Sequence, residues 1–76
     1  MKHSETLDEL LRERTGLTDL RDIAAKVHVS TRALQNLRLG RTAPREATVI
    51  ALAAALRVSR ERVAAAIAAS RAAARD

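Results

Sequence analysis

Apolar residues recur at helical spacing in five short segments, and each segment is bounded by residues that start or stop a helix. In the first segment, Ser4 or Thr6 is placed to cap a helix that Gly16 ends. The apolar positions of this helix stand at i, i+3 and i+4: Leu7, Leu10 and Leu11. The period-2 alternation typical of β-strands is absent from the sequence. The pattern therefore predicts an all-α chain of five short helices.

The second and third helices are predicted from similar signals at their ends. Asp19, followed by Asp22 three residues later, forms a capping-box pattern before the second helix. His28 stands where that helix needs a terminal residue with positive φ, which histidine tolerates better than most residues. Ser30 is placed to cap the third helix, and Gly40 follows its end.

A proline and a serine indicate where the last two helices begin. Pro44 is expected in the first turn of the fourth helix, where its missing N–H is harmless, and Ser59 is expected to cap the fifth. Residues 70–76 are rich in alanine and arginine but contain little that can be buried, so we predict a domain over residues 1–69 and a frayed tail over 70–76. The residues predicted to face the core after the first helix are Leu20, Ile23, Ala24, Val27, Leu34, Leu37, Val49, Leu52, Ala53, Leu56, Val63 and Ile67.

Composition indicates the kind of partner. The chain has 76 residues, enough for one small domain, and without cysteine or aromatic residues its core must consist of leucine, isoleucine, valine and alanine. The formal net charge is +5, and residues 32–45 hold four arginines and no acid. Such a run is often only a solvated face. Because it covers the third predicted helix, it favours a polyanionic partner.

Several classes of function find little support in the sequence. No stretch approaches about 18 consecutive apolar residues, so we expect no membrane span or signal peptide and a cytoplasmic location. His3 and His28 fall in a predicted tail and a predicted turn, and no HExxH motif or glycine-rich phosphate loop is present. We therefore expect no enzyme activity, cofactor, metal or small-molecule ligand. Four acids near the N-terminus are interpreted as a solvated surface: Glu5, Asp8, Glu9 and Glu13.

The third predicted helix has two opposite faces when residues 31–38 are drawn with about 100° per residue. Ala33, Leu37 and Leu34 fall on one side in that order, and the two leucines must face the core. The other side carries Thr31, Arg32, Gln35 and Asn36. A helix of this size is about 12 Å long, which matches the width of about 12 Å of the major groove of B-DNA.

The outward side chains suit the edges of DNA bases. Arg32 can donate two hydrogen bonds to guanine O6 and N7, and Gln35 or Asn36 can pair twice with adenine N6 and N7. Thr31 offers a hydroxyl or a methyl group. The alternative is an amphipathic helix whose polar face meets only water, but such faces usually carry glutamate and lysine at i, i+4 spacing. Because this face has no acid and carries short amides, the sequence favours base reading.

Three segments carry a resemblance to a known family: IAAKVHVS at 23–30, LQNLRLGRTAP at 34–44 and ALRVS at 55–59. Together they resemble the Cro/C1-type (XRE-type) helix-turn-helix family of phage and bacterial repressors, over about residues 5–67. The resemblance implies a five-helix, lambda-repressor-like domain that binds double-stranded DNA through its second and third helices. It also implies base-reading positions at Thr31, Arg32 and Asn36, with Gln35 beside them.

The sequence departs from the family pattern at three positions. Leu20 replaces a frequent glutamine that binds phosphate, so no anchor is expected there. His28 replaces the turn glycine. Arg38 replaces a common acid near the end of the third helix, and the added positive charge favours a phosphate contact at this residue.

Further phosphate contacts are expected from groups around the rim of the groove. Arg41 follows the glycine, Arg45 lies in the predicted first turn of the fourth helix, and Ser30 offers a hydroxyl at a helix N-terminus. For the two arginines, plain solubility is the alternative. Three arginines farther along are interpreted as solvated: Arg57, Arg60 and Arg62.

Assembly is predicted from the small size of the reading surface. One domain makes few base contacts, which favours a homodimer on a pseudo-palindromic site with recognition helices about 34 Å apart. Residues 63–69 of the fifth helix are nearly free of charge and are its predicted interface, together with a patch outside the inward stripe: Ile50, Ala51 and Ala54. The alternative function is a helix-turn-helix-fold interaction or adaptor module without sequence-specific DNA binding.

Overall fold

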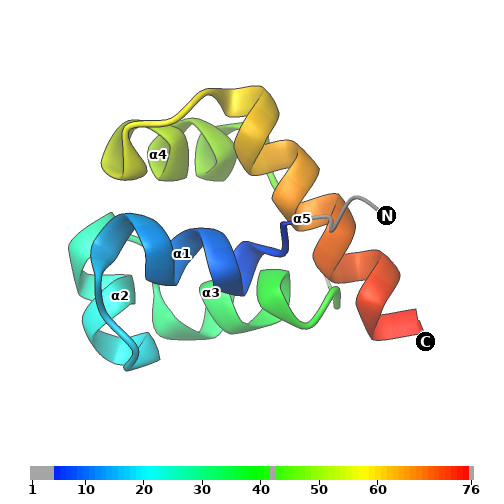
Figure 1. The fold of residues 1–76 in the computed structure, drawn as a ribbon, viewed down its shortest axis with the longest axis horizontal. Helices are drawn as coiled ribbons and strands as arrows, with labels where there is room; N and C mark the ends of the chain where they lie inside the picture. Colours follow the sequence, from blue (N-terminus) through cyan, green and yellow to red (C-terminus); the bar gives the residue numbers. More distant parts are fainter. Residues whose placement is uncertain (1–4, 42, 76) are drawn as a thin grey trace.

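A computed structural model describes residues 5–41 and 43–75 of the chain, and these form five α-helices without a strand (Figure 1). The helices are α1 (Leu7–Thr15), α2 (Leu20–Val27), α3 (Thr31–Arg38), α4 (Glu46–Leu56) and α5 (Arg60–Arg75). The predicted all-α, five-helix fold is thereby confirmed. His3 and Ser4, one of the two predicted caps of α1, lie outside the described residues, as does residue 76.

Side chains at the helix ends explain where the first helices begin and stop. Thr6 caps α1 in a capping box, and Gly16 ends it with a left-handed φ of 71°. Asp19 caps α2 by accepting a 2.9 Å hydrogen bond from the N–H of Arg21, not through the reciprocal box predicted with Asp22. The predicted boundaries therefore agree with the structure, although the second cap works through a different bond.

The start of α4 corrects one prediction. Arg45 is the N-cap with extended backbone (φ −82°, ψ 149°), so helical conformation begins only at Glu46. Pro44 therefore precedes the helix instead of occupying its first turn, where its fixed φ and missing N–H suit an extended approach. Ser59 caps α5 as predicted, accepting a 3.1 Å hydrogen bond from the N–H of Arg62.

Apolar side chains from all five helices form one core. Of the residues predicted to face inward, Leu20 and Val49 are half-buried and pack at the edge of this core. Burial of the other apolar residues confirms the helix faces read from the sequence. The buried set comprises Leu7, Leu10, Leu11, Ile23, Ala24, Val27, Leu34, Leu37, Leu52, Ala53, Leu56, Val63, Ala66 and Ile67.

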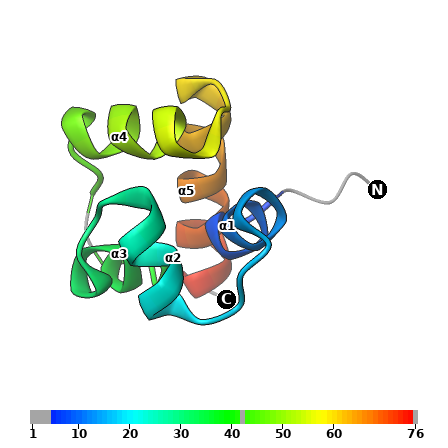
Figure 2. The ribbon, with the colours of Figure 1, turned by 90° about the vertical axis from the view of Figure 1, so that its left-hand side faces the viewer.

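The helices pack so that α3 reaches the surface on one side. In Figure 1, α1 crosses the middle of the domain with α4 above it, α2 and α3 below it, and α5 along one end. Helix α5 contacts α1, α3 and α4. The quarter-turned view places α3 and the start of α4 on the same side of the molecule, opposite the N-terminus (Figure 2).

Helix α5 continues past the predicted domain boundary at residue 69, as far as Arg75. Ser70, the first residue of the predicted tail, is only 4% exposed, and its Oγ accepts a 2.8 Å hydrogen bond from the N–H of Leu7. The expectation that little of residues 70–76 can be buried is therefore corrected at Ser70. Fraying of the remaining tail stays a prediction.

Candidate nucleic-acid interface

The turn between α2 and α3 depends on His28. This residue has left-handed backbone (φ 58°, ψ 36°), and its N–H donates to the carbonyl oxygen of Ala24. The N–H of Val29 donates to the same oxygen at 3.2 Å, so two hydrogen bonds close the end of α2. The positive φ predicted for His28 is confirmed, and α3 follows after a short turn.

Capping and burial together fix the orientation of α3. Ser30 is its N-cap, and the Oγ accepts a 3.1 Å hydrogen bond from the N–H of Ala33. The hydroxyl keeps its own proton, so it can still donate to a phosphate. Leu34 is 0% exposed and Leu37 is 3% exposed, which anchors the opposite face of α3 in the core.

The four predicted base-reading residues all lie on the face of α3 away from that anchor. Arg32 and Gln35 are exposed, whereas Thr31 and Asn36 are half-buried. Their side chains make no hydrogen bond or ion pair with another residue in the described part of the chain. Their donors and acceptors are therefore available to a partner that approaches α3 from outside.

A shallow hollow of about 450 Å³ lies between α3 and the start of α4. Ala33 and Asn36 line it from α3, and Pro44, Arg45 and Thr48 line it from the other side. The structure thus brings a predicted base-reading residue, Asn36, and a predicted phosphate-binding residue, Arg45, to one surface.

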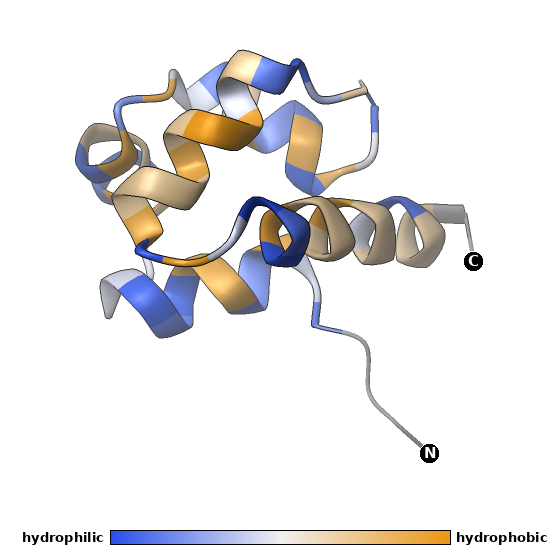
Figure 3. Cartoon of the chain, turned by 90° about the horizontal axis from the view of Figure 1, so that it is seen from above, coloured by the Kyte–Doolittle hydropathy of each residue, from blue (hydrophilic) through white to orange (hydrophobic). Residues whose placement is uncertain are grey.

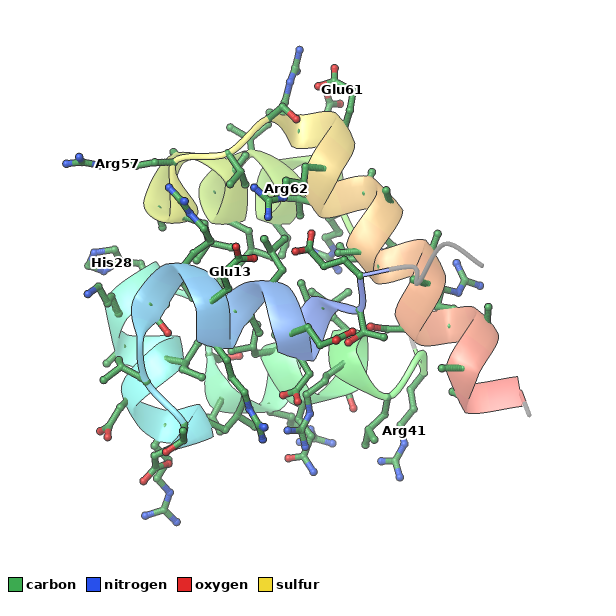
Figure 4. The ribbon with its side chains drawn as sticks, viewed as in Figure 1. Glu13, His28, Arg41, Arg57, Glu61 and Arg62 are labelled. Atoms are coloured by element: carbon green, nitrogen blue, oxygen red, sulfur yellow. The ribbon has the colours of Figure 1, made fainter. Side chains whose placement is uncertain are left out.

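Arg41 and Arg45 are exposed, and neither forms an ion pair with any residue that the structure describes. The N–H of Arg41 donates to the carbonyl oxygen of Asn36 at 2.9 Å, and the preceding Gly40 has φ 72°. Figure 4 shows the Arg41 side chain pointing away from the body of the domain beyond α3. Both guanidinium groups can therefore reach an anion at the edge of the α3 surface.

Comparison with known proteins identifies the family to which this chain belongs. The sequence model of the helix-turn-helix family, of the Cro/C1 (XRE) type, matches residues 9–63. The chain belongs to this family. The matched range of this helix-turn-helix protein contains α2, α3 and α4 whole, and the family consists of DNA-binding regulators. No curated protein and no solved structure gives a significant match to it.

Arg38 of the helix-turn-helix protein is held by an acid of α1. Its Nη1 lies 3.3 Å from Oδ1 of Asp8, and Oδ2 of Asp8 lies 3.4 Å from Nε of Arg12. Asp8 therefore bridges two arginines and is not the solvated acid that the sequence suggested. A phosphate contact by Arg38 stays a prediction, and in such a contact Asp8 would compete for the guanidinium.

Arg62 corrects a second part of the sequence interpretation, which left this arginine and the acids Glu5 and Glu13 solvated. Its guanidinium donates to Glu5 at 3.1 and 3.0 Å and to Oε2 of Glu13 at 3.0 Å, and Figure 4 shows Arg62 and Glu13 facing each other between α5 and α1. Hydrogen bonding from Arg62, reinforced by its charge, holds the pKa of Glu5 below the ordinary value. This network joins α1 to α5. No local signal could reveal it, because the partners are 57 and 49 positions apart.

Other kinds of site find no geometry in the described ranges. Residues 5–41 and 43–75 contain no group of three or more histidine, aspartate or glutamate side chains that could hold a metal ion. Within the same residues, no helix is both long and apolar enough to cross a membrane.

Proposed function

We propose that this helix-turn-helix protein is a sequence-specific transcriptional regulator of double-stranded DNA, acting as a repressor, that inserts α3 into the major groove. One observation carries the proposal: the outward face of α3 has no acid and holds four polar residues that lack partners among the described residues, opposite the buried Leu34 and Leu37. A face that only met water would usually carry glutamate and lysine at i, i+4 spacing, which this face lacks. The eight residues of α3 span about 12 Å, the width of the groove.

Each outward residue has a role that follows from its chemistry. Arg32 would donate twice to a guanine, and Gln35 and Asn36 would each pair with an adenine. Thr31 would contact a base through its hydroxyl or methyl group. Because Arg32 and Gln35 are exposed while Asn36 is half-buried beside the hollow, the first two reach farthest into the groove.

The rim of the same surface supplies the proposed phosphate contacts. Ser30 and Arg45 stand at the N-caps of α3 and α4, where helix dipoles also favour an anion, and Arg41 follows α3. Arg38 joins this set if phosphate displaces Asp8. These contacts position the helix on the duplex without selecting a sequence.

A homodimer completes the proposal. The predicted interface over residues 63–69 is corrected at Val63, Ala66 and Ile67, which are buried in the core. The exposed alanines of α5 remain available, and Figure 3 shows this helix largely in a mildly apolar shade. Ile50 is 44% exposed, and Ala54 is exposed beside the half-buried Ala51. Pairing of these surfaces about a two-fold axis would present two copies of α3 to half-sites about 34 Å apart. The predicted cytoplasmic location belongs to the same proposal.

Selection of bound duplexes from a random DNA pool, in the presence of excess competitor, tests the proposed function. We expect one half-site to recur in inverted orientation, with the selected duplex bound about 10³-fold or more tighter than a scrambled one at equal salt. Absence of any enriched sequence, together with no binding that survives competitor, would favour the interaction or adaptor module. Enrichment of a single half-site would refute the proposed dimer but not sequence-specific DNA binding.

A further inference from the structure

The last turns of α5 contact two parts of the chain that are distant in sequence. Ser70 receives the 2.8 Å hydrogen bond from the N–H of Leu7. Farther along the helix, Arg71 and Ala74 pack against Gly40, the residue that precedes Arg41. In both contacts the residues of α5 lie beyond residue 63, where the family match ends.

The contact with Gly40 is close enough to exclude a side chain. A β-carbon built on Gly40 would lie 3.0 Å from Cα of Arg71 and 3.4 Å from Cβ of Ala74. The first distance is too short for an ordinary carbon–carbon contact. Gly40 also has φ 72°, which glycine adopts without strain. The turn after α3 therefore rests directly on the backbone of α5.

We propose that residues 70–74 of α5 position Arg41 for phosphate binding by holding the Gly40 turn in place. The Arg41 side chain is exposed, so the position of the guanidinium group is set mainly by the backbone of Arg41. That backbone is fixed from one side by the 2.9 Å hydrogen bond from the Arg41 N–H to Asn36, and from the other by the support of α5 under Gly40. Ser70 holds the supporting helix itself against α1. This inference rests on the proposed function, because the phosphate that Arg41 would bind belongs to the DNA duplex.

Replacing either of two alanines of α5 by leucine separates this role from a general effect on the helix. Ala74→Leu adds bulk on the side that faces Gly40, whereas Ala72→Leu adds the same bulk about 200° away around the helix. Both residues are exposed, so both variants are expected to fold. Circular dichroism and thermal unfolding verify this before binding is measured.

Two measurements are made on both variants: hydrogen exchange of the Arg41 N–H, and the salt dependence of affinity for selected and random duplexes. We expect Ala74→Leu to speed exchange at Arg41 about 10-fold or more and to weaken both duplexes alike. The slope of log affinity against log salt should flatten by about 0.9 per protomer, the value for one lost phosphate contact. Ala72→Leu should change neither quantity.

A double variant decides whether the effect passes through Arg41. In an Arg41→Ala background, Ala74→Leu should cause no further loss of affinity. A loss that persists there, or unchanged exchange at the Arg41 N–H in Ala74→Leu, would overturn the proposal. If the wild-type chain binds no duplex, the proposed function fails together with the phosphate role of Arg41. The exchange measurement then still decides whether α5 holds the turn.

Discussion

The Oγ of Ser70 accepts a hydrogen bond from the N–H of Leu7, 63 positions earlier in the chain. Leu7 is the first residue of α1, and its N–H has no partner within that helix. Because Ser70 is buried, water cannot replace the bond. The last helix therefore completes the capping of the first, and the fold depends on a residue outside the matched family range of 9–63.

Ser70→Ala should destabilise the domain through this bond. The substitution leaves the N–H of Leu7 buried without an acceptor, which costs about 1–3 kcal/mol in the free energy of unfolding. Urea unfolding at neutral pH measures the loss. Thr18→Ala is the control, because Thr18 is exposed and forms no side-chain hydrogen bond within the described chain. A loss no greater than that of the control would show that the bond contributes nothing.

Leu37→Ala should test the orientation of α3. Leu37 is 3% exposed in a core that has no aromatic residue to fill a cavity, so we expect a loss of about 2–5 kcal/mol in unfolding free energy. Leu39→Ala, at the 37% exposed residue two positions on, is the matched control and should cost much less. Calorimetric midpoints of the two variants give the comparison. Equal midpoints would mean that Leu37 does not face the core.

Glu5 should make stability depend on pH in the acid range. Hydrogen bonding to Arg62 lowers the pKa of Glu5 from its ordinary 4.5, so between the folded pKa and 4.5 the unfolded chain binds more protons than the folded one. The contribution of the Glu5 pair is therefore complete above pH 4.5 and is lost as the pH falls through the folded pKa. The stability difference between wild type and Glu5→Gln, from urea unfolding at pH 7 to 3, should shrink over this window. Glu61→Gln is the control, because it removes the same charge at an exposed site. If the stability difference between wild type and Glu61→Gln shrank equally over this pH range, the effect would be due to net charge.

Sequence reasoning succeeded where the deciding interactions are local. Thr6, Ser30 and Ser59 act on N–H groups within three residues, and His28 needs only its own backbone, so caps and helix faces could be read from spacing. The role of Arg57 as the residue that ends α4 was not predicted, because an arginine does not indicate a positive φ, which is 58° here.

Contacts between helices were beyond such reasoning. The bonds of Arg62 to Glu13 and of Arg38 to Asp8 depend on how helices cross, which spacing along one helix does not specify. The same holds for the support of Gly40 by α5. The predicted DNA contacts depend on a partner, so measurements of binding must test them.

Asp8→Asn should strengthen DNA binding if Arg38 contacts phosphate. Asp8 lies 3.3 Å from the guanidinium of Arg38, and removing its negative charge frees that group for an anion. Affinity should rise for every duplex alike, and the slope of log affinity against log salt should steepen. Glu61→Gln changes net charge equally, and Figure 4 shows Glu61 at the end of the molecule opposite Arg41. A similar gain in both variants would leave Arg38 without a specific role.

Substitutions on the outward face of α3 should reduce discrimination between sequences. Arg32→Ala and Asn36→Ala each remove a side chain proposed to pair with one base, so we expect each to cost about 1–3 kcal/mol of specific binding. Preference should relax at one base pair per half-site, while random duplexes are bound nearly as before. Titration of the selected duplex, and of duplexes with one base pair changed, measures both effects.

Arg41→Ala and Arg45→Ala should behave differently on the same duplexes. Both arginines are exposed at the rim and are proposed to bind phosphate, so their loss should weaken selected and random duplexes alike. Each should also flatten the slope of log affinity against log salt by about 0.9 per protomer. A general basic patch would give this second behaviour at all four positions, including Arg32 and Asn36, and base reading would then be rejected in favour of non-specific DNA binding. Unchanged DNA affinity in all four variants would instead support the adaptor module, because no part of the α3 surface would then contribute to a duplex complex.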